Sequence, residues 1–153
     1  VDVSEESFVK LEKEFVAEYN KRMYKPKLFD NVSKILEQLI SRGISLSILS
    51  ASNEGVLLKL VEYYSLTNYF DHIVGVNNYG ANGKIARGQN LINKLNLNSD
   101  EIVMIGDTDY DYEVALNLKL NCILKTNGHQ SLERLQMKTK NIINSLDSLI
   151  NDY

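Results

Sequence analysis

The chain is poor in cysteine and proline and contains no tryptophan. Its 153 residues include one cysteine, Cys122, and one proline, Pro26. A single cysteine excludes a disulfide within the chain and favours a reducing compartment such as the cytosol. The single proline separates two segments of helical pattern, because proline removes a backbone donor and interrupts a helix. The apolar share of 44% is nevertheless ordinary for a globular domain.

Long apolar runs and a strong net charge are also absent. No apolar run approaches the ~20 residues that a membrane-spanning helix needs. The opening residues, VDVSEESFVK, lack the basic start and the apolar core of a signal peptide. A net charge of −3 gives no reason to expect nucleic acid or an anionic membrane as a partner. We therefore expect a cytoplasmic protein that binds neither.

The order of apolar patterns predicts an α/β fold. At 153 residues the chain fits one domain. Strand patterns lie at 44–50, 72–76, 102–105 and 121–125. Helical patterns lie at 4–24, 31–43, 53–64, 84–95, 112–118 and 145–150, with Ser4 as a plausible cap of the first. This alternation on short connections predicts a doubly wound, Rossmann-like parallel sheet rather than a barrel, since only four strands are clear.

Polar residues follow three of the predicted strands. Ser50 ends the first strand, Asn77 and Asn78 follow the second, and Asp107 follows the third. Ligands of such sheets bind beyond the carboxyl ends of the strands. We therefore expect the binding site at this edge.

Three aspartates crowd the end of the third strand, in the segment GDTDYDYEV. One or two acids there need no function, because Asp and Thr commonly cap helices. Three acids at alternate positions repel one another, and a cation would relieve that repulsion. A calcium-binding loop needs glycine at its sixth position and glutamate at its twelfth, but Tyr112 and Leu118 stand there. The pattern thus excludes a calcium-binding loop, and a hard cation such as Mg²⁺ remains the candidate.

Mg²⁺ suits one or two carboxylates, and its remaining ligands are waters and substrate phosphate oxygens. Asp107, directly at the strand end, is the expected ligand. Asp111, one helical turn later, would reach the same ion directly or through water. We expect Asp109 to cap the helix or face solvent.

The sequence resembles the haloacid dehalogenase-like superfamily, and most closely its small phosphatases of the phosphoglycolate phosphatase kind. IGDTDYDYEVA is similar to the family's last acidic motif, GDxxxD, which assigns Asp107 and Asp111 to Mg²⁺. ISLSILSAS resembles the second motif and makes Ser50 the phosphate-binding hydroxyl. GKIARGQNLINKL resembles the lysine motif and makes Lys84 the phosphate-stabilising cation, with Arg87 as the alternative. The likeness runs from about Pro26 to the end of the chain.

The resemblance implies a Mg²⁺-dependent phosphatase that acts on a small phosphorylated metabolite. An aspartate attacks phosphorus, forms an aspartyl-phosphate, and water then hydrolyses it. Lys84 and Asp107 are the implied catalytic residues of this chain. A turn-forming hydroxyl for Ser50 and an exposed basic side chain for Lys84 or Arg87 remain the alternatives.

One motif of the family is absent from the 153 residues. The nucleophile of such phosphatases lies in D-x-D-G-T at the end of the first strand. Asp2 has no second acid two residues later, and Val32 occupies that position after Asp30. The resemblance therefore predicts a helical cap remnant at 1–25 and, at 26–153, a core without its first strand. We expect a fragment or split subunit that is inactive alone.

A sheet without its central strand would expose apolar surface and unpaired strand edges. We expect a second chain that supplies the nucleophile strand, a homo-oligomer, or rearrangement of the first helix to fill the gap. A non-catalytic phosphate- and Mg²⁺-binding regulatory module is the alternative function. A response-regulator receiver is less favoured, because its acids lie near the first strand.

Three further residues carry little functional signal. Cys122 lies in an apolar strand and is expected in the core. His72 begins a strand and has no partner at metal-ligand spacing. His129 follows the last predicted strand, where a surface loop is expected, although it could border the pocket.

Overall fold

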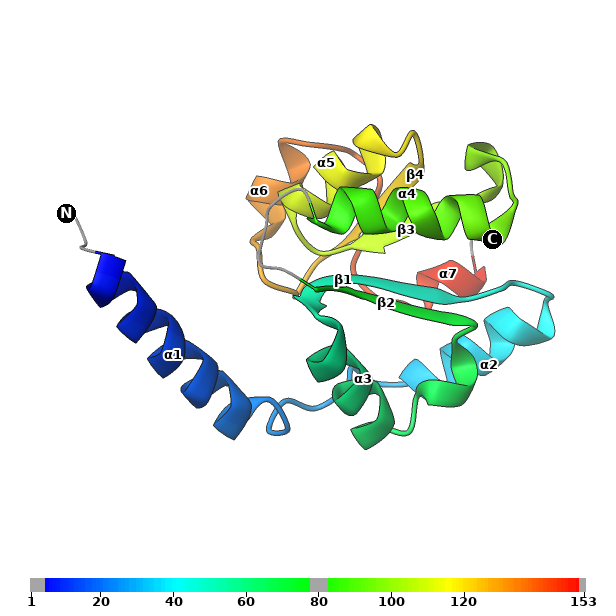
Figure 1. Ribbon diagram of the computed structural model, residues 1–153. Coiled ribbons are helices and arrows are strands. Elements are labelled where there is room, and N and C mark those ends of the chain that lie inside the picture. Colours follow the sequence, from blue (N-terminus) through cyan, green and yellow to red (C-terminus); the bar gives the residue numbers. More distant parts are fainter. Residues whose placement is uncertain (1–4, 78–82, 152–153) are drawn as a thin grey trace.

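Helices and strands alternate along most of the chain in the computed structural model, which describes residues 5–77 and 83–151 (Figure 1). The helices are α1 (Glu5–Arg22), α2 (Val32–Ser41), α3 (Glu54–Tyr63), α4 (Gly83–Leu95), α5 (Asp109–Asn117), α6 (Leu132–Gln136) and α7 (Ser148–Asn151). The strands are β1 (Ser47–Asn53), β2 (His72–Val76), β3 (Val103–Gly106), β4 (Asn121–Lys125) and β5 (Ile142–Ile143). The expected cap at Ser4 and the candidate Asn78 lie outside the described residues.

Every strand pair is parallel, which confirms the predicted α/β class. The strands form two sheets, with the orders β1-β2 and β3-β4-β5. In the first sheet Leu49 lies opposite Val74, and in the second Gly106 lies opposite Leu124. The described residues contain no pairing between β1 and β3, so the sheet that the sequence predicts as one unit is divided.

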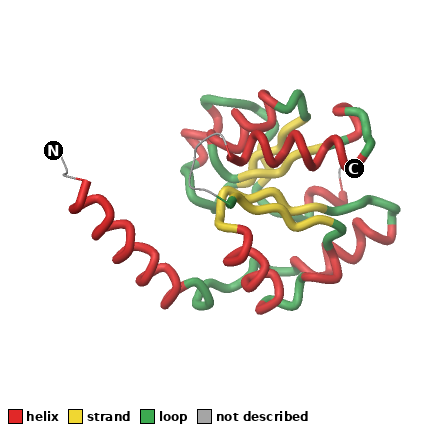
Figure 2. Tube along the Cα trace, in the orientation of Figure 1, coloured by secondary structure: helices red, strands yellow, loops and turns green. Residues whose placement is uncertain are grey.

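Helices pack on both faces of the strands (Figure 2). Helices α3 and α4 both contact β1 and β2, and Figure 1 shows them on opposite faces. Helix α5 contacts β3, β4 and α4. Helix α1 extends away from these layers in Figure 1, and its assignment as a cap remnant stays a prediction.

Within the described ranges, the buried apolar residues form two hydrophobic clusters rather than one contiguous core. The first contains Ala115, Cys122, Leu124 and Leu135 and joins α5, β4 and α6. The second is centred on α3, where Leu57 and Val61 pack against the strands of the first sheet. Cys122 is thus a core residue as expected, and burial raises the pKa of its thiol to about 11.

Element boundaries differ from the sequence predictions where polar residues begin or end an element. Strand β1 continues through the polar stretch to Asn53, whose side chain then caps α3 by accepting from the N–H groups of Gly55 and Val56. Helix α5 begins at Asp109 rather than at Tyr112, because Thr108 provides an earlier cap. Helix α6 and strand β5 were not predicted, since five and two residues are too few for a periodic pattern.

None of the helices in the described ranges is both long enough and apolar enough to span a lipid bilayer.

Candidate active site

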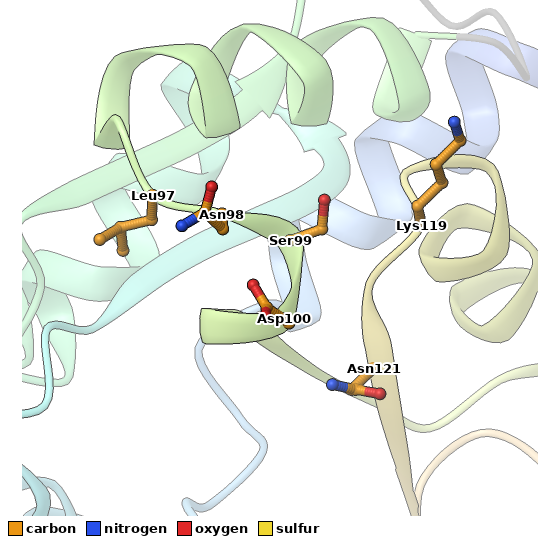
Figure 3. A pocket seen from close by; sticks show the side chains of 6 residues that line it. All are labelled: Leu97, Asn98, Ser99, Asp100, Lys119 and Asn121. Carbon is orange, nitrogen blue, oxygen red and sulfur yellow. The ribbon is translucent and has the colours of Figure 1, made fainter.

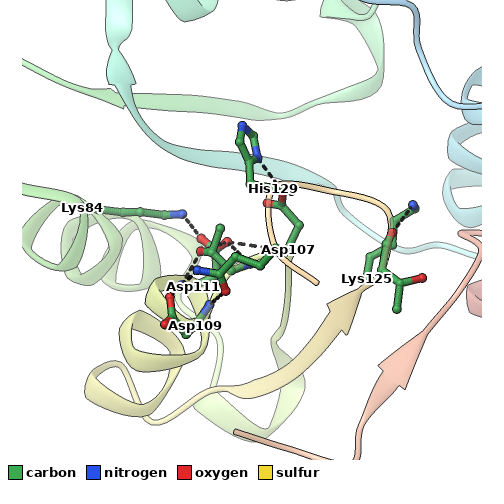
Figure 4. Close-up of polar contacts among 9 residues, drawn as sticks. Lys84, Asp107, Asp109, Asp111, Lys125 and His129 are labelled. Carbon is green, nitrogen blue, oxygen red and sulfur yellow. Dashed lines mark hydrogen bonds and ion pairs between the residues drawn. The ribbon is translucent and has the colours of Figure 1, made fainter. Parts of the chain in front are cut away.

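A buried ion pair joins the beginnings of α4 and α5. The Nζ of Lys84 lies 2.5 Å from Oδ1 of Asp111, and the two side chains are 8% and 10% exposed. Helix α4 follows β2 along the chain and α5 directly follows β3, so this contact brings the carboxyl ends of both strands to one place (Figure 4). The sequence predicted a site at this edge.

Asp111 fixes the loop that leaves β3. Its Oδ2 accepts the backbone N–H groups of Asp107 and Thr108 and the hydroxyl of Thr108. Thr108 in turn accepts the N–H of Asp111, which completes a capping box at the start of α5. Burial raises the pKa of Asp111, but hydrogen bonds from Lys84 and Thr108 and the charge of Lys84 outweigh it and hold that pKa below its ordinary value.

Two glycines allow the acids to pack this closely. A Cβ at Gly106 would overlap the side chain of Asp111, and a Cβ at Gly128 would overlap that of Asp107. Glycine at both positions is therefore a steric requirement of the site.

Asp107 extends from the loop toward the segment after β4. Its Oδ2 accepts the backbone N–H of His129 at 2.7 Å and lies 2.7 Å from the Nδ1 of the same residue. Its Oδ1 accepts no hydrogen bond from the described residues. His129 is exposed as expected, yet it borders the site by contacting Asp107.

Asp109 has a structural role that the sequence did not predict. Its carboxylate accepts hydrogen bonds from Arg134 at 2.6 and 2.9 Å and from the side-chain amide of Gln130 at 2.7 Å. These hydrogen bonds lower the pKa of Asp109 to about 2, and the bond from Gln130 has a larger effect than those from Arg134. The expectation of a capping or solvent-facing role is therefore wrong: Asp109 ties α5 to the segment that begins α6.

Of the two basic candidates on α4, only Lys84 faces the acids. Arg87 forms an ion pair with Glu54 and donates to the carbonyl of Gly75 at 2.9 Å. Glu54 also accepts the N–H of Gly75, so Arg87 links α3, β2 and α4. Because Arg87 has this structural role, Lys84 remains the candidate cation of the site.

Ser50 forms no hydrogen bond with the acids in the described residues, and it lies within β1 rather than at its end as predicted, because the strand continues to Asn53. It stands in β1 between Leu49, which pairs with Val74, and Asn53, which pairs with Val76. Ser50 is half-buried, and its Oγ accepts the N–H of Ser52 at 3.1 Å. Its hydroxyl proton has no acceptor among the described residues, so it is available to a ligand.

Lys125, at the carboxyl end of β4, was missed by the sequence analysis. Its side chain is buried, donates to the carbonyl of Thr126 at 2.8 Å and lies 3.6 Å from the centroid of the Phe29 ring. Burial lowers the pKa of Lys125, and the charge of Asp107 opposes that effect. A polar residue at a strand end, the criterion that selected Ser50, would have found it.

The acids offer an incomplete metal site. Both oxygens of Asp111 are engaged by Lys84 and the loop, whereas Asp107 keeps one oxygen open. In the described part of the chain, no three His, Cys, Asp or Glu side chains are placed to hold a metal ion together. One carboxylate fits Mg²⁺ only if waters, substrate or a further acid supply the remaining ligands.

A hollow lies at the amino ends of β3 and β4 (Figure 3). Its lining residues precede β3 or stand at the start of β4: Leu97, Asn98, Ser99, Asp100, Lys119 and Asn121. This edge holds the amino ends of the strands, away from Lys84 and Asp107, so the hollow is not part of the candidate site.

Removing one partner of the buried ion pair should destabilise the fold. We expect Lys84→Met to lower the free energy of unfolding by about 3 kcal/mol, because it leaves the charge of Asp111 buried without a counterion. Adding Asp111→Asn should recover part of that loss, as measured by urea unfolding at pH 7. Lys94→Met, at an exposed position of the same helix, is the control. A Lys84→Met loss no larger than the control's would contradict the pair's assigned role.

The lowered pKa of Asp109 predicts a pH effect on stability. A carboxyl group with a depressed pKa stabilises the fold above its unfolded pKa and loses that contribution as the pH falls. For Asp109 the loss should occur between pH 3.8 and about 2. We expect Asp109→Asn to flatten the dependence of unfolding on pH in this range. The control is exposed Asp100→Asn, and equal curves for both variants would count against the interaction with Arg134.

Comparisons with known proteins agree with this geometry. The family model of haloacid dehalogenase-like hydrolases matches residues 2–125. A crystal structure described as a predicted phosphatase from Clostridium acetobutylicum is 32% identical, with a TM-score of 0.76 over 82% of this chain and 59% of that one. A haloacid dehalogenase-like protein from Streptococcus pneumoniae is 18% identical, with a TM-score of 0.85 over 98% of this chain and 71% of that one.

A predicted phosphoglycolate phosphatase from Haemophilus somnus is also similar, with 18% identity and a TM-score of 0.83 over 99% of this chain and 68% of that one. No curated protein matches the chain. The chain thus spans 59% of the length of the Clostridium acetobutylicum protein. With a parallel α/β fold, a family match over most of its residues and the acidic loop after β3, the chain belongs to the haloacid dehalogenase-like hydrolase family.

Proposed function

We propose that the chain forms the phosphate- and Mg²⁺-binding part of a phosphomonoester hydrolase for small phosphorylated metabolites. The observation that supports this most strongly is the buried Lys84–Asp111 pair beside Asp107, at the carboxyl ends of parallel strands. The family and the phosphatase descriptions of similar structures favour the same reaction.

Lys84 and Ser50 are the proposed phosphate ligands. The ammonium group of Lys84 would offset negative charge on the transferring group, while Asp111 holds that ammonium at the edge of the sheet. The free hydroxyl proton of Ser50 would donate to a phosphate oxygen. Because the two residues lie on different elements, their separation is set by the fold rather than by local chain geometry.

Asp107 is the proposed Mg²⁺ ligand, through the oxygen that His129 leaves open. Asp111 would support the ion indirectly, because it fixes the N–H and hence the position of Asp107. A bound Mg²⁺ would neutralise charge on the phosphate and on the attacking carboxylate.

The attacking aspartate is proposed to come from outside the 153 residues. Its carboxylate oxygen would form a bond to phosphorus as the bond to the alcohol oxygen breaks, and the alcohol would leave with a proton taken from solvent, to which the attacking water later returns one. Water would then attack phosphorus, releasing inorganic phosphate and restoring the carboxylate. Asp107 and Asp111 do not fit the attacking role, since one is the proposed metal ligand and the other is fully hydrogen-bonded.

The isolated chain should bind phosphate without hydrolysing a phosphate ester. We expect inorganic phosphate to bind in the presence of Mg²⁺ in calorimetry, and Ser50→Ala to weaken binding about fivefold through loss of one hydrogen bond. Ser47→Ala, on the same strand, should leave binding unchanged. Equal affinities of the two variants would exclude Ser50 as a phosphate ligand.

An activity assay tests whether the isolated chain already contains a nucleophile. With p-nitrophenyl phosphate and Mg²⁺, we expect no turnover by the isolated chain above the buffer rate. Turnover that Asp107→Ala abolishes would show that the chain contains its own nucleophile. Absence of phosphate binding together with absence of turnover would rule out the proposed site.

A further inference from the structure

The turn that follows β4 contains an Asn-Gly sequence. Asn127 and Gly128 lie in a bend directly after Thr126, and both residues are exposed. Asn127 has a φ of 62°, in the left-handed region that asparagine tolerates better than most residues. Within the described residues, neither the side chain of Asn127 nor the backbone N–H of Gly128 forms a hydrogen bond. The side-chain amide and the next backbone nitrogen are therefore both free to react.

These two groups react with each other when asparagine loses its amide. The backbone nitrogen of Gly128 attacks Cγ of Asn127 and loses its proton, ammonia leaves, and a cyclic succinimide forms. Water then opens the ring. Attack at Cγ gives aspartate, whereas attack at the backbone carbonyl gives isoaspartate, in which the chain continues through Cβ and Cγ. Glycine favours ring closure, because no Cβ obstructs its nitrogen.

The residue before the turn is held by buried hydrogen bonds. The N–H of Thr126 donates to the carbonyl of Ile143 at 3.0 Å, and its hydroxyl donates to Oδ1 of Asn144 at 3.0 Å. The carbonyl of Thr126 accepts a hydrogen bond from Nζ of Lys125 at 2.8 Å. Thr126 is only 5% exposed, so these hydrogen bonds are shielded from water and strengthened by their surroundings.

The residue after the turn is held by an acid of the candidate site. Oδ2 of Asp107 lies 2.7 Å from the backbone nitrogen of His129 and 2.7 Å from its Nδ1 (Figure 4). The side chain of His129 is 87% exposed, so water competes for this contact. Gly128 also lies so close to Asp107 that a Cβ there would overlap the carboxylate. The turn thus joins a buried anchor at Thr126 to an exposed anchor at Asp107.

A longer backbone does not fit between these two anchors. Isoaspartate lengthens the chain by one carbon within a turn of two residues, so one anchor has to move. The exposed contact with Asp107 is the weaker anchor, because hydrogen bonds that compete with water contribute less than buried ones. Gly128 has no space to shift toward Asp107. We therefore expect His129 to leave Asp107 when isoaspartate forms.

We propose that Asn127-Gly128 is a self-modification site, and that its conversion to isoaspartate releases His129 from Asp107. Water is the only co-reactant, and ammonia is the only small product. An ageing chain would thereby lose a contact that holds the candidate metal ligand in place. The inference goes beyond the proposed function, since neither the modification nor the released contact requires phosphate or Mg²⁺.

Peptide mass mapping of the full chain during incubation in mildly alkaline buffer tests the modification. Trypsin releases residues 126–134 separately from the other Asn-Gly sequence at 82–83. We expect the 126–134 peptide to gain the mass difference between OH and NH₂, and electron-transfer fragmentation to identify isoaspartate in it. The rate should lie within about tenfold of that in the urea-unfolded chain, because exposed turns open at little cost. A slower rate, or no conversion, would overturn the self-modification.

Two variants at position 127 separate the loss of the amide from the lengthening of the backbone. Asn127→Gly keeps access to positive φ but has no side chain to react, so its peptide should not change during incubation. Freshly prepared Asn127→Asp carries the aspartate product on a backbone of ordinary length, so its His129 should keep the contact with Asp107. Conversion at the same position in Asn127→Gly would overturn the assigned chemistry.

The amide signal of His129 in NMR spectra reports the released contact. This N–H donates to a carboxylate at 2.7 Å, so its proton should resonate downfield in the fresh chain and in both fresh variants. In the incubated chain we expect a second His129 signal displaced upfield, in the same proportion as isoaspartate. A His129 signal that remains downfield in the isoaspartate form, or that also moves in fresh Asn127→Asp, would overturn the release by backbone lengthening.

Discussion

One buried ion pair links the two halves of the molecule at the candidate site. Lys84 begins the helix that packs on β1 and β2, whereas Asp111 lies in the helix that packs on β3 and β4. The two sheets share no strand pairing in the described residues, so this contact is a direct link between them at the site. Because Asp111 also fixes the N–H of Asp107, the same carboxylate sets the position of the proposed metal ligand.

The acidic loop has to stabilise the start of α5 and also keep carboxylate oxygens open for a cation, and one carboxylate cannot easily do both. A carboxylate that caps a helix and neutralises a lysine stabilises the fold, but it has little capacity left for a cation. The chain separates these demands between residues: Asp111 is fully hydrogen-bonded, Asp109 ties α5 to Arg134, and Asp107 keeps an open oxygen. Three acids of similar spacing thus have three different roles.

Much of this arrangement follows from the sequence, because it depends on local pattern. The ends of β2 and β4, the glycine before Asp107 and the helix that begins at Gly83 are visible as periodicity and spacing, whereas the polar end of β1 is not. The contacts of Asp109 with Gln130 and Arg134, of Lys125 with Phe29 and of His129 with Asp107 are not, since these partners lie 21 or more residues away in the chain. The division of the sheet could be expected only from the resemblance, because residue patterns do not show which strands are neighbours.

The central claim is that Ser50, Lys84 and Asp107 form one phosphate site across the two sheets. Amide chemical shifts of the isolated chain, followed while inorganic phosphate is titrated in the presence of Mg²⁺, test it most directly. The account predicts that the signals of Ser50, Lys84 and Asp107 change together, with one shared dissociation constant. Chemical-shift changes confined to residues of one sheet, or different dissociation constants for the residues of the two sheets, would contradict the account.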